Sequence, residues 1–86
     1  MSTLDIRIET DLWATSMFPE GLIERWFVGD GTAVIAGDRV AEVRIEDALH
    51  EITAPASGRL TISSLRNSVV EPGAVIAQVN AAILGA

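Results

Sequence analysis

The side chains best suited to chemistry lie together in one short segment. Glu46, Asp47, His50 and Glu51 bring three carboxylates and the only histidine of the chain within a few residues of one another. Such a cluster can bind a metal ion weakly or transfer protons as an acid and a base. On a strand, however, His50 and Glu51 point to opposite faces, and His50 shares its face with Ile52. The pattern therefore favours a half-buried structural histidine, and a small metal or acid–base site stays the alternative.

The residue types that the chain lacks narrow the chemistry further. There is no cysteine, which excludes disulfides, thiolate metal ligands and cysteine nucleophiles, and which suits a reducing cytosol. All six basic residues are arginines, so no side-chain amine is available for acylation or Schiff-base formation. A net charge of −6 repels phosphate backbones, so we do not expect nucleic acid as a partner. We predict neither catalysis nor a bound cofactor or metal ion.

A second group of candidates is apolar. Trp13, Met17 and Phe18 lie in the segment 11–19, between two predicted strands. Large apolar groups near a loop usually need covering. Either a partner protein covers them, or they fold back over one end of the core, and the sequence leaves both alternatives open.

The elements that must position these residues are strands. Short apolar runs alternate with Gly, Pro, Asn and Asp, a pattern typical of an all-β sandwich or barrel. A tight turn at Glu46 and Asp47 predicts a hairpin, and no window shows the periodicity of an amphipathic helix. The predicted strands cover residues 4–8, 22–28, 40–45, 48–53, 59–63, 69–70 and 75–79.

Length and composition indicate one small domain. The 86 residues are 49% hydrophobic, and we assign residues 1–80 to the domain and residues 81–86 to a short apolar tail. The first residues lack the features of a signal peptide, and no apolar run approaches the roughly 20 residues that cross a bilayer. We expect a cytoplasmic protein.

The sequence also contains an internal repeat. The segment 37–43 aligns with the segment 73–79, and each begins with a glycine. Val34 and Val70 precede the two glycines at the same distance, and Gly21 and Gly58 open the two copies with a one-residue deletion in the second. Because neither unit can bury a sheet face alone, we expect the two to pack together with quasi-twofold symmetry.

These motifs resemble the biotinyl/lipoyl attachment domain family, and the lipoyl domains in particular. Residues 20–28, Gly31 and residues 36–43 are similar to the first half of such a domain, and residues 54–60 and 71–79 to its second half. The resemblance runs from about Leu4 to Val79. It implies a flattened β-barrel, or sandwich, of two four-stranded antiparallel sheets related by a quasi-twofold axis.

The resemblance also identifies one departure. In the family, a lysine at the tip of the hairpin between the halves is acylated by lipoate or biotin. Here Asp47 occupies that position and Glu46 the position before it, and a carboxylate cannot form the amide. Aspartate tolerates the left-handed backbone that tight turns need, so the turn can survive the exchange. The family fold also implies that Trp13, Met17 and Phe18 lie beside this turn.

We therefore interpret the chain as a domain that neither catalyses nor carries. The resemblance implies that it docks on a protein component of a 2-oxo acid dehydrogenase-type or carboxylase-type assembly. The candidate docking residues are Trp13, Met17, Phe18, Glu46 and Asp47. Two alternatives remain: the metal or acid–base site of the hairpin, and a purely structural homo-oligomer built through exposed strands or the tail 81–86.

Overall fold

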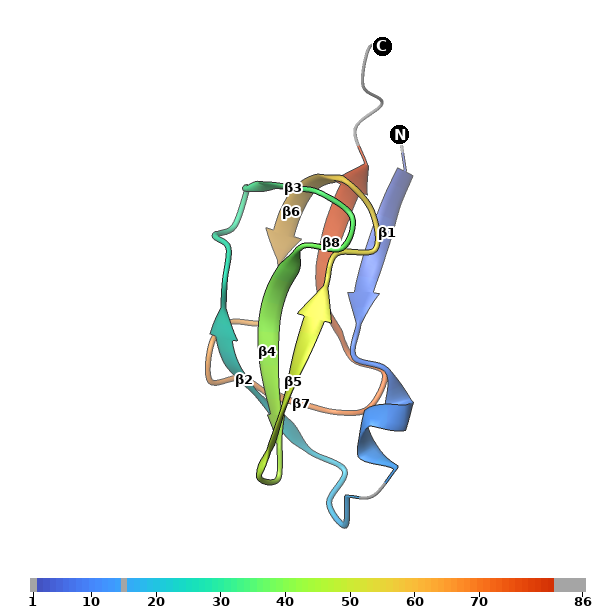
Figure 1. Cartoon of the computed structure of the whole chain (residues 1–86), viewed down its shortest axis with the longest axis vertical. Coiled ribbons are helices and arrows are strands. Elements are labelled where there is room, and N and C mark those ends of the chain that lie inside the picture. Colours follow the sequence, from blue (N-terminus) through green and yellow to red (C-terminus); the bar gives the residue numbers. More distant parts are fainter. Residues whose placement is uncertain (1, 15, 82–86) are drawn as a thin grey trace.

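Two antiparallel β-sheets face each other across one core in the computed structural model, which describes residues 2–14 and 16–81 (Figure 1). One sheet has the strand order β1-β8-β6-β3, and the other has the order β5-β4-β2-β7. The arrangement confirms the predicted all-β fold with two four-stranded sheets. The strands are β1 Ser2–Arg7, β2 Gly21–Trp26, β3 Ala33–Val34, β4 Arg39–Ile45, β5 Ala48–Thr53, β6 Gly58–Ile62, β7 Val69–Val70 and β8 Val75–Ala81.

Two features lie outside the predicted set of strands. One is the two-residue strand β3, which is not in the predicted set although residues 33–36 are all apolar. A single turn of 3-10 helix, η1 Thr10–Trp13, follows β1. No helix in the described part of the chain has the length and apolar character to cross a membrane. The predicted tail begins at Ala81, the last residue of β8, and residues 82–86 lie outside the described residues.

The pairing of the strands confirms the internal repeat. Gly21 pairs with Val70, and its counterpart Gly58 pairs with Val34. At the centre of each sheet, β4 lies between β5 and β2, just as β8 lies between β1 and β6. Each half therefore contributes strands to both sheets, because neither half has enough apolar surface to stand alone.

A β-bulge explains the one-residue difference between the two copies. Along β2, Ile23 pairs with Val43 and Arg25 pairs with Glu42, so Glu24 is the extra residue on that strand. The equivalent stretch of β6 pairs with β8 without interruption. A bulge adds one residue to a strand while keeping the register on either side. The apparent deletion is thus an insertion at Glu24 in the first copy.

Equivalent positions of the two repeat copies form the centre of the core. Gly37 and Gly73 both have positive φ, 94° and 83°, and each turns the chain into a central strand. The three apolar positions that follow are fully buried in both copies: Val40, Ala41 and Val43 in β4, and Ile76, Ala77 and Val79 in β8. Trp26 packs against this core, and its Nε1–H donates to the Ser64 carbonyl oxygen at 2.9 Å.

Candidate functional site

The β4–β5 hairpin ends in the two-residue turn Glu46-Asp47, at the end of the molecule away from the start of β1 and the end of β8 (Figure 1). Ile45 pairs with Ala48 at the last rung, so the turn is tight. Glu46 takes the left-handed conformation, with φ 54°. Of the two turn residues, Glu46 and not Asp47 has the positive φ.

Trp13 anchors the segment that runs beside this turn. Its side chain is only 7% exposed, and its Nε1–H donates to the Glu20 carbonyl oxygen at 3.2 Å. The indole lies over Gly21, where an added Cβ would come within 3.1 Å of the Trp13 Cζ2 atom and 3.3 Å of the Arg44 carbonyl oxygen. A glycine at position 21 therefore makes room for the ring. Of the two alternatives for this residue, the structure places Trp13 in the core.

Met17 and Phe18, in contrast to Trp13, lie on the surface. Met17 is 87% exposed and Phe18 61%. The Met17 N–H donates to Glu46 Oε1 at 3.3 Å, which ties this segment to the turn as expected. Next to it, the Phe18 N–H donates to Ser16 Oγ at 3.2 Å, and the Ser16 hydroxyl donates to the Phe18 carbonyl oxygen at 2.8 Å. Local hydrogen bonds and the buried Trp13 thus hold two large apolar side chains in an exposed position beside the turn.

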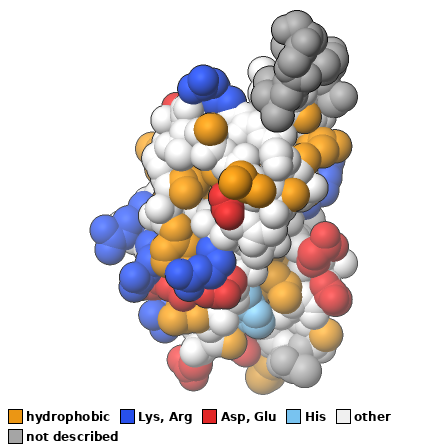
Figure 2. Space-filling model, turned by 45° about the horizontal axis from the view of Figure 1, so that its top comes forward, with side chains coloured by type: hydrophobic (Ala, Val, Ile, Leu, Met, Phe, Trp, Pro, Cys, Tyr) orange, Lys and Arg blue, Asp and Glu red, His pale blue; other side chains and the backbone are white. Residues whose placement is uncertain are grey.

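A pocket of about 360 Å³ opens between η1 and the hairpin. Apolar groups of Leu12, Ile45 and Ala48 form part of its wall, and the remainder is polar. The polar lining residues are Ser16, Glu46, Asp47 and His50. Figure 2 shows the single histidine (pale blue) at the surface, with hydrophobic and acidic side chains around it. The half-buried position predicted for His50 is confirmed, and here the half that is exposed faces a pocket.

Comparison with known protein families agrees with this geometry. A family model described as biotin-requiring enzyme, the biotin/lipoyl model, matches residues 14–79. The chain belongs to the biotinyl/lipoyl domain family. Domains of this family are carrier-type rather than catalytic domains, and they typically work within dehydrogenase or carboxylase complexes. No curated protein matches the chain.

The four hairpin residues do not form one metal site in this biotinyl/lipoyl domain. Glu46, Asp47 and His50 line the pocket, whereas Glu51 pairs with Arg39 through an Oε2–Nη1 contact of 2.8 Å. Residues 2–14 and 16–81 contain no group of three histidine, aspartate or glutamate side chains placed to share a metal ion. Strand alternation separates His50 from Glu51, as the pattern favoured.

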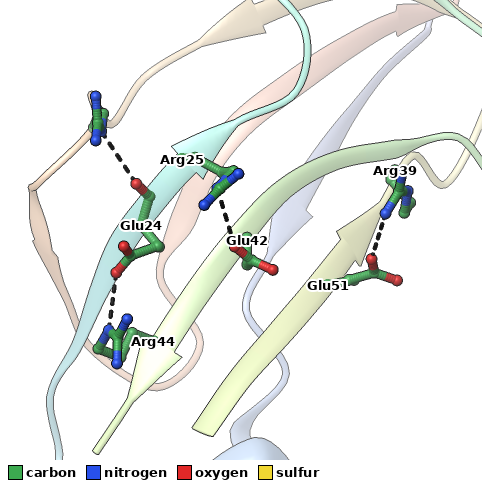
Figure 3. Close-up of polar contacts among 7 residues, drawn as sticks. Glu24, Arg25, Arg39, Glu42, Arg44 and Glu51 are labelled. Atoms are coloured by element: carbon green, nitrogen blue, oxygen red, sulfur yellow. Dashed lines mark hydrogen bonds and ion pairs between the residues drawn. The ribbon is translucent and has the colours of Figure 1, made fainter. Parts of the chain in front are cut away.

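Arg25, Arg39 and Arg44 lie on the outer face of the β5-β4-β2-β7 sheet, where they alternate with acidic side chains (Figure 3). The Oε1 atom of Glu24, the bulged residue, accepts a hydrogen bond from Arg44 Nε at 2.9 Å. The carbonyl oxygen of Glu24 accepts a second hydrogen bond, from Arg66 Nε, at 3.2 Å. The hydrogen bond from Arg44 lowers the pKa of the Glu24 carboxyl below its ordinary value. Arg25 pairs with Glu42 at 3.2 Å on the neighbouring rung. We name the three ion pairs of this sheet the ion-pair ladder: Arg25–Glu42, Arg39–Glu51 and Arg44–Glu24. Each charge in the ladder is paired with one of opposite sign.

Every arginine therefore has a partner away from the turn. The contacts are Arg7 to Asp5 and to the Gly73 carbonyl, Arg25 to Glu42, Arg39 to Glu51, Arg44 to Glu24, Arg59 to the Gly31 carbonyl and Arg66 to the Glu24 carbonyl. Around the turn the exposed carboxylates of Glu20, Glu46 and Asp47 take part in no ion pair with a described residue. This end of the domain is acidic, and Arg44, which is bonded to Glu24, lines a second pocket there together with Glu20 and Glu46.

Two parts of the site are not predicted by the sequence patterns. Leu12 and Ser16 line the pocket, but neither belongs to a recognisable sequence motif. Their position beside the hairpin depends on the path of the chain through η1. Glu24 is unremarkable in the sequence, as one glutamate among many. The one-residue mismatch between the repeat copies is the available signal for Glu24, because an insertion in one of two equivalent strands indicates a bulge.

Proposed function

We propose that this biotinyl/lipoyl domain carries neither lipoate nor biotin, and that it serves as a protein-interaction module. The partner is a component of a 2-oxo acid dehydrogenase-type or carboxylase-type multienzyme system, and the domain performs no catalysis itself. The observation that carries the proposal is the turn at Glu46-Asp47, where the family scaffold is complete and the acceptor position holds an aspartate.

The chemistry of the chain supports the loss of the carrier role. Attachment of lipoate or biotin needs a nucleophilic side-chain amine, and the six basic residues here are all arginines. A guanidinium stays protonated at physiological pH and cannot substitute for the lysine amine. Asp47 supplies a carboxylate at the acceptor position, which forms no amide with another carboxylic acid.

The surface beside the turn supports the docking role. Met17 and Phe18 are exposed to 87% and 61%, and they are held there by hydrogen bonds and by the buried Trp13. Holding large apolar groups out of the core costs hydrophobic stabilisation unless something covers them. Aromatic residues and methionine are also enriched in protein interfaces. We name the residues Met17, Phe18, Glu46 and Asp47 the tip surface.

The carrier role is tested by mass. The purified chain is incubated with ATP and a lipoate ligase and lipoate, or a biotin ligase and biotin, and its intact mass is measured. We expect the unmodified mass in both reactions. Asp47→Lys is the matched variant, because it restores a side-chain amine at the acceptor position alone. A mass increment of one lipoyl or biotinyl group on the wild-type chain would refute the proposal.

The docking role is tested by capture with matched surface variants. Phe18→Ser removes an exposed apolar group from the tip surface, whereas Ile35→Ser removes one of similar exposure, 67%, from the β3–β4 connection. We expect Phe18→Ser to lose dehydrogenase or carboxylase subunits that the wild type captures from its native host. An interface anchor contributes about 2 kcal/mol or more, which is about 30-fold in affinity.

The controls separate docking from folding and from self-association. Both variants must keep the thermal midpoint of the wild type, and light scattering must give the same mass for all three. Equal capture of the same subunits by Phe18→Ser and Ile35→Ser would exclude the tip surface as the docking site. Light scattering also tests the homo-oligomer hypothesis, which stays a prediction.

A further inference from the structure

We infer that the pocket beside the Glu46-Asp47 turn receives a cationic side chain, an arginine or a lysine, from the docking partner. The inference rests on the proposed function, because it specifies the chemistry of the same partner. It concerns a different part of the tip surface from Met17 and Phe18, namely the hollow between η1 and the hairpin.

The shape and lining of the pocket fit such a side chain. Its volume of about 360 Å³ is at the small end of the usual range for binding pockets, about 300–1,000 Å³. Leu12, Ile45 and Ala48 offer apolar contact along part of the wall. Arginine and lysine bury their aliphatic stems against such surface while the charged head stays at the rim. An apolar side chain would instead leave the polar lining without partners.

The negative charges at the rim of the pocket favour a positively charged head group on the bound side chain. Glu46 and Asp47 line the pocket, and neither forms an ion pair within the described residues. Glu46 accepts one hydrogen bond, from the Met17 N–H through Oε1. The arginine nearest to the turn along the hairpin, Arg44, is held by Glu24 at 2.9 Å on the ion-pair ladder. The Arg44 guanidinium also lies close enough to Asp47 for their charges to attract, but its ion pair is with Glu24. A cation that bonds the two rim carboxylates directly therefore has to come from another molecule.

The geometry also argues against the other occupants of an acidic pocket. No three carboxylate or histidine side chains in the described chain are placed to share a metal ion. An anionic group would meet two carboxylates and no arginine in the lining of this pocket, which costs binding free energy. An arginine can engage a carboxylate through two parallel hydrogen bonds and is enriched in interfaces for that reason.

The test is a titration of the isotope-labelled chain followed by backbone amide chemical shifts. The probes are the Nα-acetyl amides of arginine and lysine, and the Nα-acetyl amide of norleucine supplies a stem without the charge. We expect the cationic probes to shift the amides of Leu12, Ser16 and residues 45–50, with dissociation constants in about the millimolar range. The norleucine probe should bind more weakly, and added salt should weaken only the cationic probes.

Charge variants locate the interaction. Asp47→Asn removes one carboxylate from the rim, and Asp38→Asn removes one at the opposite end of β4. We expect Asp47→Asn to weaken the cationic probes about two- to fivefold, the size of an exposed ion pair, and Asp38→Asn to leave them unchanged. The norleucine probe should respond to neither variant.

Several outcomes would overturn the inference. These are the absence of shifts at the pocket, equal binding of norleucine and arginine probes, or equal effects of Asp47→Asn and Asp38→Asn. The result is separable from that of the proposed function. If Phe18→Ser abolishes capture of the partner while the probes show no preference for cations, docking stands and the assigned pocket chemistry is wrong. If Phe18→Ser captures the same subunits as Ile35→Ser, the docking role itself fails.

Discussion

Removal of the Trp13 side chain tests how the tip surface is built. The structure makes Trp13 a core residue that supports the exposed segment rather than a contact for the partner. Trp13 is 7% exposed, and its indole N–H bonds the Glu20 carbonyl oxygen at 3.2 Å, so one side chain fixes both ends of the segment that displays Met17 and Phe18. Trp13→Ala should therefore lower stability as well as disturb the surface.

The expected magnitude follows from the burial. Truncation of a buried aromatic residue to alanine costs about 3–5 kcal/mol. An 86-residue domain has a total stability of about 4–13 kcal/mol, so this loss is a large share of it. Each kcal/mol moves the thermal midpoint of a domain this size by about 4–8 °C, which predicts a fall of about 12 °C or more. Met17→Ala removes a side chain that is 87% exposed and should change stability by less than about 0.5 kcal/mol.

The assay is urea and thermal unfolding followed by circular dichroism, with Trp13→Phe as an intermediate variant. Phenylalanine keeps an aromatic ring but loses the N–H donor and part of the volume, so its cost should lie between the other two, at about 1–2 kcal/mol. If Trp13→Ala unfolds at the same urea concentration as Met17→Ala, the indole does not stabilise the core. The account of how Met17 and Phe18 are displayed would then be refuted.

The remaining predictions concern the ladder, the repeat and the pocket. Gly58→Ala should destabilise by about 2 kcal/mol or more in urea unfolding, because the added Cβ meets the backbone of β8, whereas Gly29→Ala should be neutral or slightly stabilising; equal effects would contradict the close approach. The hydrogen bond from Arg44 lowers the pKa of Glu24, so its contribution to stability is present at neutral pH and is lost as the pH falls through the carboxyl range, about pH 5 to 2. The stability difference between wild type and Glu24→Gln should accordingly shrink over that range, and a constant difference across a pH series of urea unfolding would count against the pairing. His50→Leu should keep the wild-type thermal midpoint, whereas His50→Asp should lower it by adding a third carboxylate at the pocket, and identical midpoints would place His50 outside it.

The sequence by itself determined the fold. Strands are specified locally, by alternation of apolar residues and by the glycines and prolines that end each run. The apolar runs on either side of Glu46-Asp47 predict the hairpin, and both of its strands have nearly the predicted bounds. The repeat predicts the symmetry of the two sheets, because equivalent glycines and apolar positions in the two halves require equivalent places in the sheets.

The absence of the acceptor lysine is likewise a property of the sequence alone, since it depends on residue type and on no geometry. The spacing along the chain also predicts which residue stands at the acceptor position. The prediction is Asp47, because the motifs on both sides of the hairpin resemble those of the family in spacing.

Only the tertiary structure decided which of the apolar residues near the turn are displayed. Trp13, Met17 and Phe18 have similar character in the sequence, yet the first is buried and the other two are exposed. The reason is that burial here depends on room at a distant site: the missing side chain of Gly21 admits the indole, and the turn of η1 carries Trp13 into that space. The sequence also does not show that the turn carboxylates form no ion pair, because that depends on which acidic residue each arginine contacts. The bulge at Glu24 places two of its oxygens where they accept hydrogen bonds from Arg44 and Arg66, and the carboxylates of the turn form no ion pair with a described residue.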